Sequence, residues 1–409
     1  MKFVGVDIAK SDHCLGGIDA QGKVVVKPQR FSQNAEGFAK LAAILSDLGG
    51  PSVVTVGCEA TGHYWVLLAE ELSRLGYRLQ VFNPILSADA GRLSVRGRKT
   101  DEDDCLVIAK VLRAGGFSPV ALPDEQAGTL KRLVRHRQGA VERCANLKKR
   151  LTGLLDLVFP EFAHLFSDAY GPTARVLLSH APSARLLAAV KPSQFTQRVR
   201  KASHGRLGLE RIQEVVAAAR TSLAATRMDM ATEMAIRMTI QEIDLLEQQV
   251  AAYEAEIEKS TSEQQSLLTT IPGIGKILSG VIMAEIGTID AFIPRPGDGR
   301  TSDGIHRLLA FAGLDPRIRS SGQWTGKVRM SKRGSSTLRT AIWRAAFIAS
   351  RHPAFAPMYH KHRVEMKQPF LVALSHVARE MTQAIYGVLK HQTAFDEQAF
   401  AKGPCKAAA

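Results

Sequence analysis

Four acidic residues in the first 104 positions have the types and spacing that a divalent-metal site needs. Asp7 lies near the end of the first predicted strand, and Glu59 ends the fourth. Asp101 and Asp104 open a predicted helix, where their i,i+3 spacing puts both carboxylates on one face. Two metal ions roughly 4 Å apart can polarise a phosphodiester and generate a nucleophile, and several carboxylates are needed to hold them. The pattern therefore predicts a site for Mg²⁺, two ions in number, because Mg²⁺ prefers all-oxygen ligands.

Each of these acids also has an ordinary explanation when it is taken alone. Thr100 can cap the helix, and acids in a first turn are favoured by the helix dipole. That explanation suffices for Glu102 and Asp103, but Asp104 fits it less well because Asp has a low helix propensity. Carboxylates gathered this closely would repel one another without a cation, so the metal is part of the hypothesis.

The elements that carry the acids alternate between strand and helix over residues 1–120, which we expect to form one domain. Apolar runs and turn residues predict elements of both kinds. The predicted strands are 2–8, 14–18, 24–26, 53–58 and 78–82, and the predicted helices are 35–48, 64–75 and 101–114. An antiparallel meander that leads into alternating strands and helices is typical of an α/β sheet of the ribonuclease H type.

The middle of the chain, residues 121–262, has the pattern of an α-helical coiled-coil region. Apolar residues recur at near-heptad spacing along a predicted helix at 125–158, and again along a later acidic segment. The first stripe is Leu130, Leu133, Val141, Cys144, Leu147, Leu151, Leu154 and Val158. The second stripe is Ile243, Leu246, Val250, Tyr253 and Ile257. We expect two long arms joined by smaller helices between 172 and 225.

Residues 263–395 predict a third, mainly α-helical domain, followed by a flexible tail at 396–409. The sequence Ile-Pro-Gly-Ile-Gly at 271–275 resembles the turn of a helix-hairpin-helix, whose backbone amides can bind phosphate. A loop rich in Pro and Gly follows at 294–303, then a basic hairpin at 323–333 and a helix at 338–351. Trp324 and Trp343 are expected to be packing residues rather than base-stacking platforms.

The net charge of +15 and pI of about 9.7 indicate a polyanionic partner, because cations that meet phosphates release condensed counterions. Basicity alone does not distinguish DNA, RNA and an anionic membrane. The apolar runs are too short to span a bilayer, so we expect a cytoplasmic protein without membrane contact. The five cysteines are scattered and form no CxxC motif, which favours reduced thiols over a disulfide or zinc framework.

Three basic clusters are candidates for nucleic-acid contact. One flanks the acidic helix start, one lies along the first long helix, and one follows the Pro/Gly-rich loop. Their residues are Arg96, Arg98, Lys99, Lys131, Arg132, Arg135, Lys148, Lys149, Arg150, Lys327, Arg329, Lys332, Arg333 and Arg339. A solvated loop or helix face is the ordinary alternative for each cluster.

Taken together, the motifs resemble the DEDD transposases of bacterial insertion sequences. The N-terminal motifs are Gly-Val-Asp-Ile-Ala-Lys at 5–10, Cys-Glu-Ala-Thr-Gly at 58–62 and Lys-Thr-Asp-Glu-Asp-Asp at 99–104. The C-terminal motifs are Ile-Pro-Gly-Ile-Gly at 271–275, Ala-Gly-Leu-Asp-Pro at 312–316, Ser-Gly at 321–322, Ser-Lys-Arg-Gly at 331–334 and Leu-Arg at 338–339. The resemblance covers nearly the whole chain in the family's order, except that the stretch 292–303 is longer than the family's usual one.

The resemblance implies a RuvC-like N-terminal domain, a coiled-coil region and a C-terminal transposase domain with a nucleophilic serine. By motif position that serine is Ser321, with Ser320 as the adjacent alternative. Without the resemblance, Ser-Ser-Gly is typical of a polar turn. The family also implies a structured bridge RNA that pairs with donor and target DNA.

The leading hypothesis is therefore an insertion-sequence transposase that performs RNA-guided strand cleavage and exchange. It would act as a homo-oligomer, a dimer or a tetramer, because two DNA ends must be cut. One alternative is a RuvC-like, metal-dependent junction resolvase or nuclease in which Ser321 is idle. Another is a non-catalytic nucleic-acid-binding protein whose acids are helix caps and surface groups.

Overall fold

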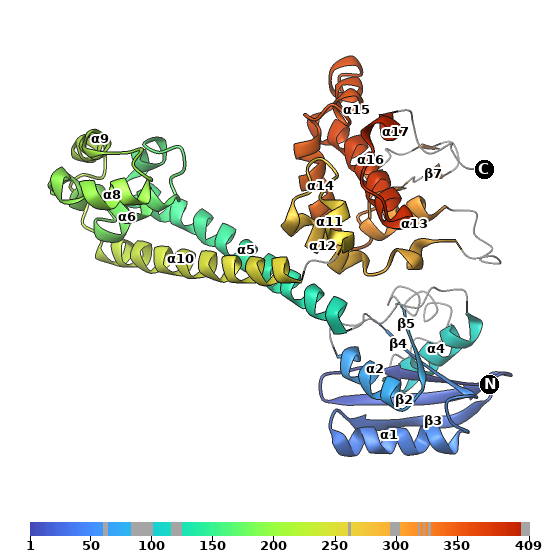
Figure 1. Ribbon diagram of the computed structural model, residues 1–409. Coiled ribbons are helices and arrows are strands. Elements are labelled where there is room, and N and C mark those ends of the chain that lie inside the picture. Colours follow the sequence, from blue (N-terminus) through green and yellow to red (C-terminus); the bar gives the residue numbers. More distant parts are fainter. Residues whose placement is uncertain are drawn as a thin grey trace. The chain divides into compact units, whose positions relative to one another are not determined.

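The computed structural model divides the chain into two compact units, Met1–Pro123 and Asp124–Ala409. The residues that it describes are 1–59, 64–82, 101–115, 125–260, 263–294, 303–317, 320–321, 324–325 and 329–401. The first unit is a mixed α/β domain, and the second is helical apart from short strands (Figure 1). This confirms the α/β start and the mostly helical remainder predicted from the sequence.

The first unit is built on a five-stranded sheet with the order β3-β2-β1-β4-β5. Strands β1, β2 and β3 are antiparallel neighbours, whereas β4 and β5 run parallel to β1. The strands are β1 (Lys2–Asp7), β2 (Asp12–Asp19), β3 (Val24–Ser32), β4 (Val54–Glu59) and β5 (Arg78–Phe82). The helices are α1 (Ala35–Asp47), α2 (Trp65–Arg74) and α4 (Asp101–Ala114). The arrangement agrees with the expected ribonuclease H-like order of elements.

Strand β3 is longer than the sequence pattern predicts, because it continues past Pro28. Proline removes a backbone donor and therefore usually interrupts a strand. Here β3 lies at the edge of the sheet, where the missing donor costs no ladder hydrogen bond to a further strand. The edge position, which depends on topology, explains the difference.

Side chains alternate between the two faces of the sheet, so each face packs against different helices. On β1, Val4 and Val6 are buried on one face in a core with Leu41 of α1 and Leu68 of α2. Gly5, between them, faces the opposite side and contacts α4. The sheet is therefore covered on both faces within this unit.

The second unit contains two long helices, α5 (Glu125–Val158) and α10 (Met230–Lys259), that lie along each other (Figure 1). Smaller helices complete this part, which we call the arm. They are α6 (Pro172–His180), α7 (Ala184–Ala188), α8 (Thr196–Ala202) and α9 (Leu209–Thr221), with short 3-10 turns at Pro160–His164 and Pro192–Gln194. Members of both predicted stripes pack together here, since Cys144, Leu151, Ile243 and Leu246 share one core. The pairing of two long helices is confirmed, while their supercoiling stays a prediction.

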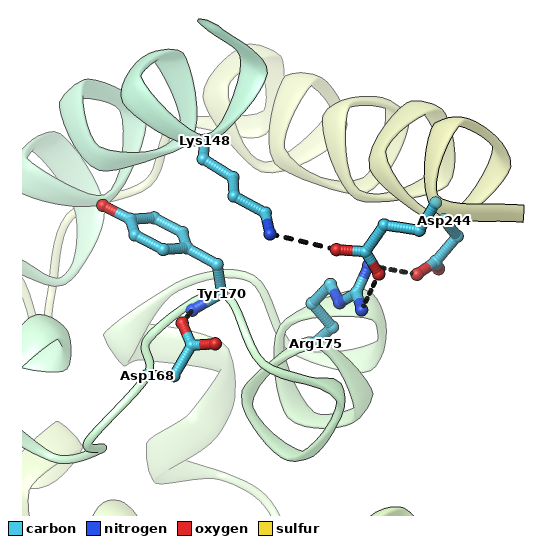
Figure 2. Close-up of polar contacts among 6 residues, drawn as sticks. Lys148, Asp168, Tyr170, Arg175 and Asp244 are labelled. Carbon is cyan, nitrogen blue, oxygen red and sulfur yellow. Dashed lines mark hydrogen bonds and ion pairs between the residues drawn. The ribbon is translucent and has the colours of Figure 1, made fainter. Parts of the chain in front are cut away.

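An ion network links α5, α6 and α10 in the arm (Figure 2). The buried Arg175 donates from Nη1 to Oδ1 of Asp244 and from Nη2 to Oε2 of Glu247, each at 2.6 Å. Lys148 Nζ donates to Oε1 of the same glutamate at 3.0 Å. Burial acts to raise the pKa of Glu247, but the hydrogen bonds from Lys148 and Arg175 outweigh it and hold the pKa below its usual value.

The C-terminal part of the second unit packs its helices around α16, where Val377, Met381 and Ile385 are fully buried. Its helices are α11 (Glu263–Leu268), α12 (Lys276–Ile286), α13 (Gly304–Ala312), α14 (Ser336–Ala349), α15 (Ala356–His360), α16 (Phe370–His391) and α17 (Glu397–Ala401), with a 3-10 turn at Ile289–Phe292 and a π-helical turn at Lys361–Glu365. Two strand pairs accompany them, β6 (Pro316–Arg317) with β9 (Arg329–Met330), and β7 (Ser320–Ser321) with β8 (Trp324–Thr325).

Three further observations bear on the sequence predictions. The expected tail from residue 396 is folded as far as 401, because Phe400 of α17 packs against Phe355 and Phe395. Cys14, Cys58, Cys105 and Cys144 are buried, and these four described cysteines are thiols rather than disulfides. Within the described ranges, no helix combines the length and apolarity that crossing a membrane requires.

Candidate functional site

Asp7 and Glu59 lie side by side at one edge of the sheet. Strands β1 and β4 are parallel and pair Val6 with Cys58, so the next residue of each strand is an acid. Asp7 follows Gly5 by two positions and Glu59 follows Gly57 by two, which puts both carboxylates on the face that α4 covers. Both acids are half-buried. The sequence prediction that acids at two strand ends meet is thus supported by the strand register.

A row of three glycines lets α4 approach this face closely. Gly16, Gly5 and Gly57 are direct partners across β2, β1 and β4. A Cβ atom on Gly5 would lie 2.1 Å from the carbonyl oxygen of Cys105 and 2.5 Å from the amide nitrogen of Ala109, both in α4. Only glycine fits where backbone meets backbone at this distance. The glycine row therefore fixes how near the first turns of α4 come to β1.

The start of α4 is next to Asp7. Cys14 is the strand partner of Asp7, and its Sγ lies 3.7 Å from Sγ of Cys105 in α4. The pKa of the Cys105 thiol is raised above its usual value, mainly by burial, then by Cys14 and by the negative charge of Asp7. Asp104 directly precedes Cys105 in α4 and is half-buried. That its carboxylate joins Asp7 and Glu59 stays a prediction.

These observations bring together Asp7 of β1 and Glu59 of β4, and α4, which carries Asp104, packs on the same face of the sheet. Asp101 begins α4, one helical turn earlier, but its side chain lies outside the described residues. Among the side chains that the structure describes, no three His, Cys, Asp or Glu groups lie close enough together to hold a metal ion. The donors at this edge are carboxylate oxygens, which suit Mg²⁺ better than a softer metal. Asp7 and Glu59 supply two such donors side by side, and further ligands from α4 stay a prediction.

Ser320 and Ser321 form strand β7, which pairs with β8 so that Ser321 lies opposite Trp324. The basic hairpin expected at 323–333 is thus present in part, but β8 and β9 pair with earlier strands, β7 and β6, rather than with each other. The side chains of both serines lie outside the described residues. The structure gives the backbone on which the predicted nucleophile stands, in the second unit of the chain.

Two of the sequence motifs, one before this segment in the sequence and one after it, fold against each other. The amide of Ser331 donates to the carbonyl of Asp315 at 2.9 Å, and its hydroxyl donates to the Asp315 carboxylate. The amide of Lys332 donates to the carbonyl of Gly313 at 3.1 Å. Gly313 ends α13 in the left-handed region, with φ of 67°. The residues at 312–316 and 331–334 therefore hold the base of the loop that carries Ser321.

The predicted nucleic-acid contacts divide into several groups. Arg135 is bound by the buried Glu285, with Nε to Oε1 at 3.1 Å, and Lys148 belongs to the arm's ion network. Arg339 donates to the backbone carbonyls of Ala312 and Lys332. Burial, and then the charge of Arg135, lower the pKa of Lys131, although Glu285 acts to raise it. Arg135, Lys148 and Arg339 therefore have structural roles that the sequence analysis did not foresee.

Other predicted cations are exposed and available to a partner. They are Arg132, Lys149, Arg150, Arg329, Lys332 and Arg333. Arg96, Arg98, Lys99 and Lys327 lie outside the described residues.

Glu285 is a residue that the sequence analysis missed. Its side chain is buried in α12, where it accepts hydrogen bonds from Arg135 of α5 and from the hydroxyl of Ser335. The sequence held a clue, because Glu285 is the single charged residue in the run 277–286. A lone acid in a buried helix requires a partner.

Comparison with known proteins identifies the family. Residues 4–160 match a DEDD transposase family, and residues 265–361 match the family described as transposase IS116/IS110/IS902. The IS117 mini-circle protein of Streptomyces coelicolor is 26% identical over 97% of this chain and 95% of its own length. The transposase for IS1111A of Coxiella burnetii is 23% identical over 91% of this chain and 83% of its own. The pilin gene-inverting protein of Moraxella bovis is 29% identical over 34% of this chain and 40% of its own.

These matches cover both the unit that carries the paired carboxylates and the unit that carries Ser321. They extend nearly end to end in the relatives encoded by insertion elements. The chain belongs to the IS110 family of insertion-sequence DEDD transposases.

Proposed function

We propose that this transposase is an RNA-guided serine recombinase that cuts and rejoins DNA strands with its carboxylate edge and Ser321. The observation that carries the proposal is the meeting of β1, β4 and the start of α4. The strand register supports it by setting Asp7 and Glu59 side by side, and the glycine row lets α4, which carries Asp104, pack closely on the same face. A surface role for each acid would require no such convergence. The serine and the guide RNA rest on the family resemblance.

The carboxylates of Asp7, Glu59, Asp101 and Asp104 are the residues that would hold Mg²⁺. When bound, the ions would polarise the phosphodiester and offset the negative charge of the transition state. The protein's own contribution is to place oxygen ligands from rigid strands and a packed helix. Ligands on rigid elements hold their geometry more accurately than ligands on loops.

The proposed chemical step is an exchange of one phosphoester bond for another. The Oγ atom of Ser321 attacks phosphorus, the bond from phosphorus to the leaving sugar oxygen breaks, and the hydroxyl hydrogen of the serine ends on that sugar oxygen. A phosphoserine link then holds the other strand end. Attack by a sugar hydroxyl of the partner strand reverses the exchange and releases the serine. The energy of the broken bond is conserved, so the reaction requires no nucleotide cofactor.

The partners in this proposal are donor DNA, target DNA and a structured bridge RNA. The exposed cations of the arm and of the C-terminal part, such as Lys149, Arg150 and Arg333, would contact phosphates of these partners. The protein would act as a dimer or a tetramer, because exchange requires the cutting of two DNA ends.

The test is to trap the covalent intermediate. Ser321→Ala is expected to abolish protein–DNA adducts on denaturing gels while leaving binding of the guide RNA intact. Ser320→Ala is the matched control, since it changes the neighbouring serine of the same strand, and it is expected to keep the adducts. Adducts that persist in Ser321→Ala and vanish in Ser320→Ala would move the role to Ser320. Adducts that persist in both would refute a serine nucleophile.

A metal-dependent junction resolvase is the second candidate, because all four acids lie in the first unit and the serine in the second. In that case Asp7→Asn and Glu59→Gln would abolish cleavage, but Ser321→Ala would cleave as well as the parent protein. Cleavage without any adduct would favour the resolvase. Unchanged recombination in Asp7→Asn and Glu59→Gln would exclude both candidates.

A further inference from the structure

A long groove of about 1590 Å³ runs between α14 and α16 in the C-terminal part of the second unit. Residues of α12 line it as well, and the residues around the β6–β9 strand pair lie at its wall. Its volume exceeds the roughly 300 to 1,000 Å³ that is typical of sites for a single small molecule. The groove therefore has room for several residues of a chain-like ligand.

One face of α14 forms a wall of this groove and carries both cationic and aromatic side chains. Arg339, Trp343 and Phe347 follow one another at i,i+4 spacing, so they lie in one row along the helix. Arg344 and Ile348 lie in the neighbouring row. This helix face thus carries two cations and two aromatic rings, a combination that surfaces binding single nucleic-acid strands use.

Large apolar side chains of the groove remain in contact with water. Phe347 is 44% exposed, Ile348 57% and Leu371 64%. The Phe347 ring lies edge-on to Phe370 with centroids 6.1 Å apart, and the guanidinium of Arg351 lies 5.5 Å from the Phe347 ring centre. A contiguous exposed apolar surface with charged neighbours usually marks a binding site.

The positive charge of the groove favours an anionic ligand. Arg329, Lys332, Arg344 and Arg379 line it, whereas Glu254, its single lining acid among the described residues, already accepts hydrogen bonds from Arg137. The positive charge is therefore not balanced within the groove. His376, at the same wall, adds no charge at neutral pH, because burial, His362 and Arg379 lower its pKa below its usual value of 6.5.

We propose that this groove binds an unpaired nucleic-acid strand, with bases against Trp343 and Phe347 and phosphates against Arg344 and Arg379. The proposal rests on the proposed function and specifies where an opened strand is held. Unpaired bases offer apolar faces that can cover the aromatic and aliphatic side chains. A duplex keeps its base faces stacked inside and presents mainly phosphates. An apolar wall with a cationic rim therefore fits a single strand better than a duplex.

The position of the groove in the chain supports this assignment. Pro316 and Arg329, of the β6–β9 pair, both line the groove. Ser320, the first residue of β7, follows Pro316 by four positions. A strand in the groove is thus bound by the same segment that leads to the proposed nucleophile.

The test compares binding of a labelled single strand of about 12 nucleotides, within the roughly 4 to 16 that such sites cover, with binding of its duplex. Fluorescence anisotropy is measured on the full chain in EDTA, so that the result does not depend on strand cleavage. Phe347→Ala is expected to weaken single-strand binding roughly 5- to 150-fold and to leave duplex binding unchanged. Arg344→Gln with Arg379→Gln is expected to weaken single-strand binding and to reduce its salt dependence.

Phe311→Ala is the matched control for the aromatic change. Phe311 is 38% exposed and also pairs edge-on with another phenylalanine, Phe292, but it does not line the groove. Lys201→Gln, on the exposed surface of α8, is the control for the charge changes. Both controls are expected to bind like the parent protein, and circular dichroism confirms that every variant is folded.

Photocrosslinking with an iodouracil strand locates the contact, and the expected crosslinked peptide is α14. Equal losses of single-strand and duplex affinity in Phe347→Ala, or crosslinks outside α14 and α16, would overturn the proposal. A change in the oligomer size of Phe347→Ala without a change in its DNA affinity would also overturn the proposal, because the groove would then be a protein interface. Loss of adduct formation in the Ser321 experiment leaves this binding test unaffected, so the two proposals fail separately.

Discussion

Replacement of Gly5 by alanine should inactivate this transposase although Gly5 has no side chain and takes no part in chemistry. An alanine Cβ at this position would lie 2.1 Å from the Cys105 carbonyl oxygen, 2.5 Å from the Ala109 amide nitrogen and 2.9 Å from Cβ of Ile108. Two of these three atoms are backbone, which no rotamer change can move. Helix α4 would have to move away from β1 as a body.

The size of this movement follows from the same contacts. The shortest falls about 1.3 Å short of the 3.4 Å at which ordinary contact begins. Overpacking of this kind costs about 1 to 3 kcal/mol of the free energy of unfolding. Displacement of a catalytic group by about 1 Å can lower the rate about 100-fold. Because Asp101 and Asp104 belong to α4, the movement would separate them from Asp7 and Glu59.

The assay measures thermal unfolding and adduct formation side by side, with Gly57→Ala as the matched control. Gly57 lies in the same glycine row, but the three atoms nearest to its Cβ would all be side-chain atoms of Leu112, at 3.0 Å or more. That leucine can adjust, so the control should retain most of its activity. Gly5→Ala protein that unfolds and reacts like the parent would show that α4 does not set the carboxylate geometry.

Two further predictions concern stability. Arg175→Met should lower the free energy of unfolding by about 1 to 3 kcal/mol in denaturant titrations, because Asp244 and Glu247 lose a buried partner. The loss is limited because the two carboxylate side chains are 51% and 38% exposed and can rehydrate. An unchanged denaturation midpoint would contradict this prediction. Burial raises the pKa of Glu380 to about 7 from its usual 4.5, so its ionisation opposes folding. The contribution of Glu380 to the free energy of unfolding is therefore fully present below pH 4.5 and falls as the pH rises to 7. Glu380→Gln should then stabilise the protein at pH 8 by about 1 to 2 kcal/mol, allowing for partial exposure, and have little effect at pH 4; an equal effect at both values would contradict the shift.

The elements that carry the carboxylates could be predicted because their cues are local. Asp7 and Glu59 end apolar runs of strand length, and the first turn of α4 begins with acids at i,i+3 spacing. The neighbouring positions of Asp7 and Glu59 also follow from the parallel pairing of β1 and β4. The glycine row could not be predicted, because Gly16, Gly5 and Gly57 become neighbours only through the register of three strands.

The assignment of cations was less accurate for a similar reason. Lys148 and Arg135 have the spacing of an exposed basic face, yet their partners Glu247 and Glu285 are about 100 and 150 residues away. The groove between α14 and α16 was also missed, since its two walls are separate helices. Trp343 was expected to be a packing residue, and it is half-buried, but it also lines that groove.

The two long helices each pass from one hydrophobic core into another, and this restricts how the protein can change in length. Helix α5 places Leu130 and Val134 in the C-terminal core and Leu151 in the arm core, while α10 does the same in reverse with Ile257 and Leu246. One inserted residue would rotate everything beyond it by about 100° and turn the packed stripe toward water. Only insertions of seven residues, made in both helices, keep the apolar residues of each helix facing both cores. The length of the arm should therefore differ among relatives by multiples of about 10 Å.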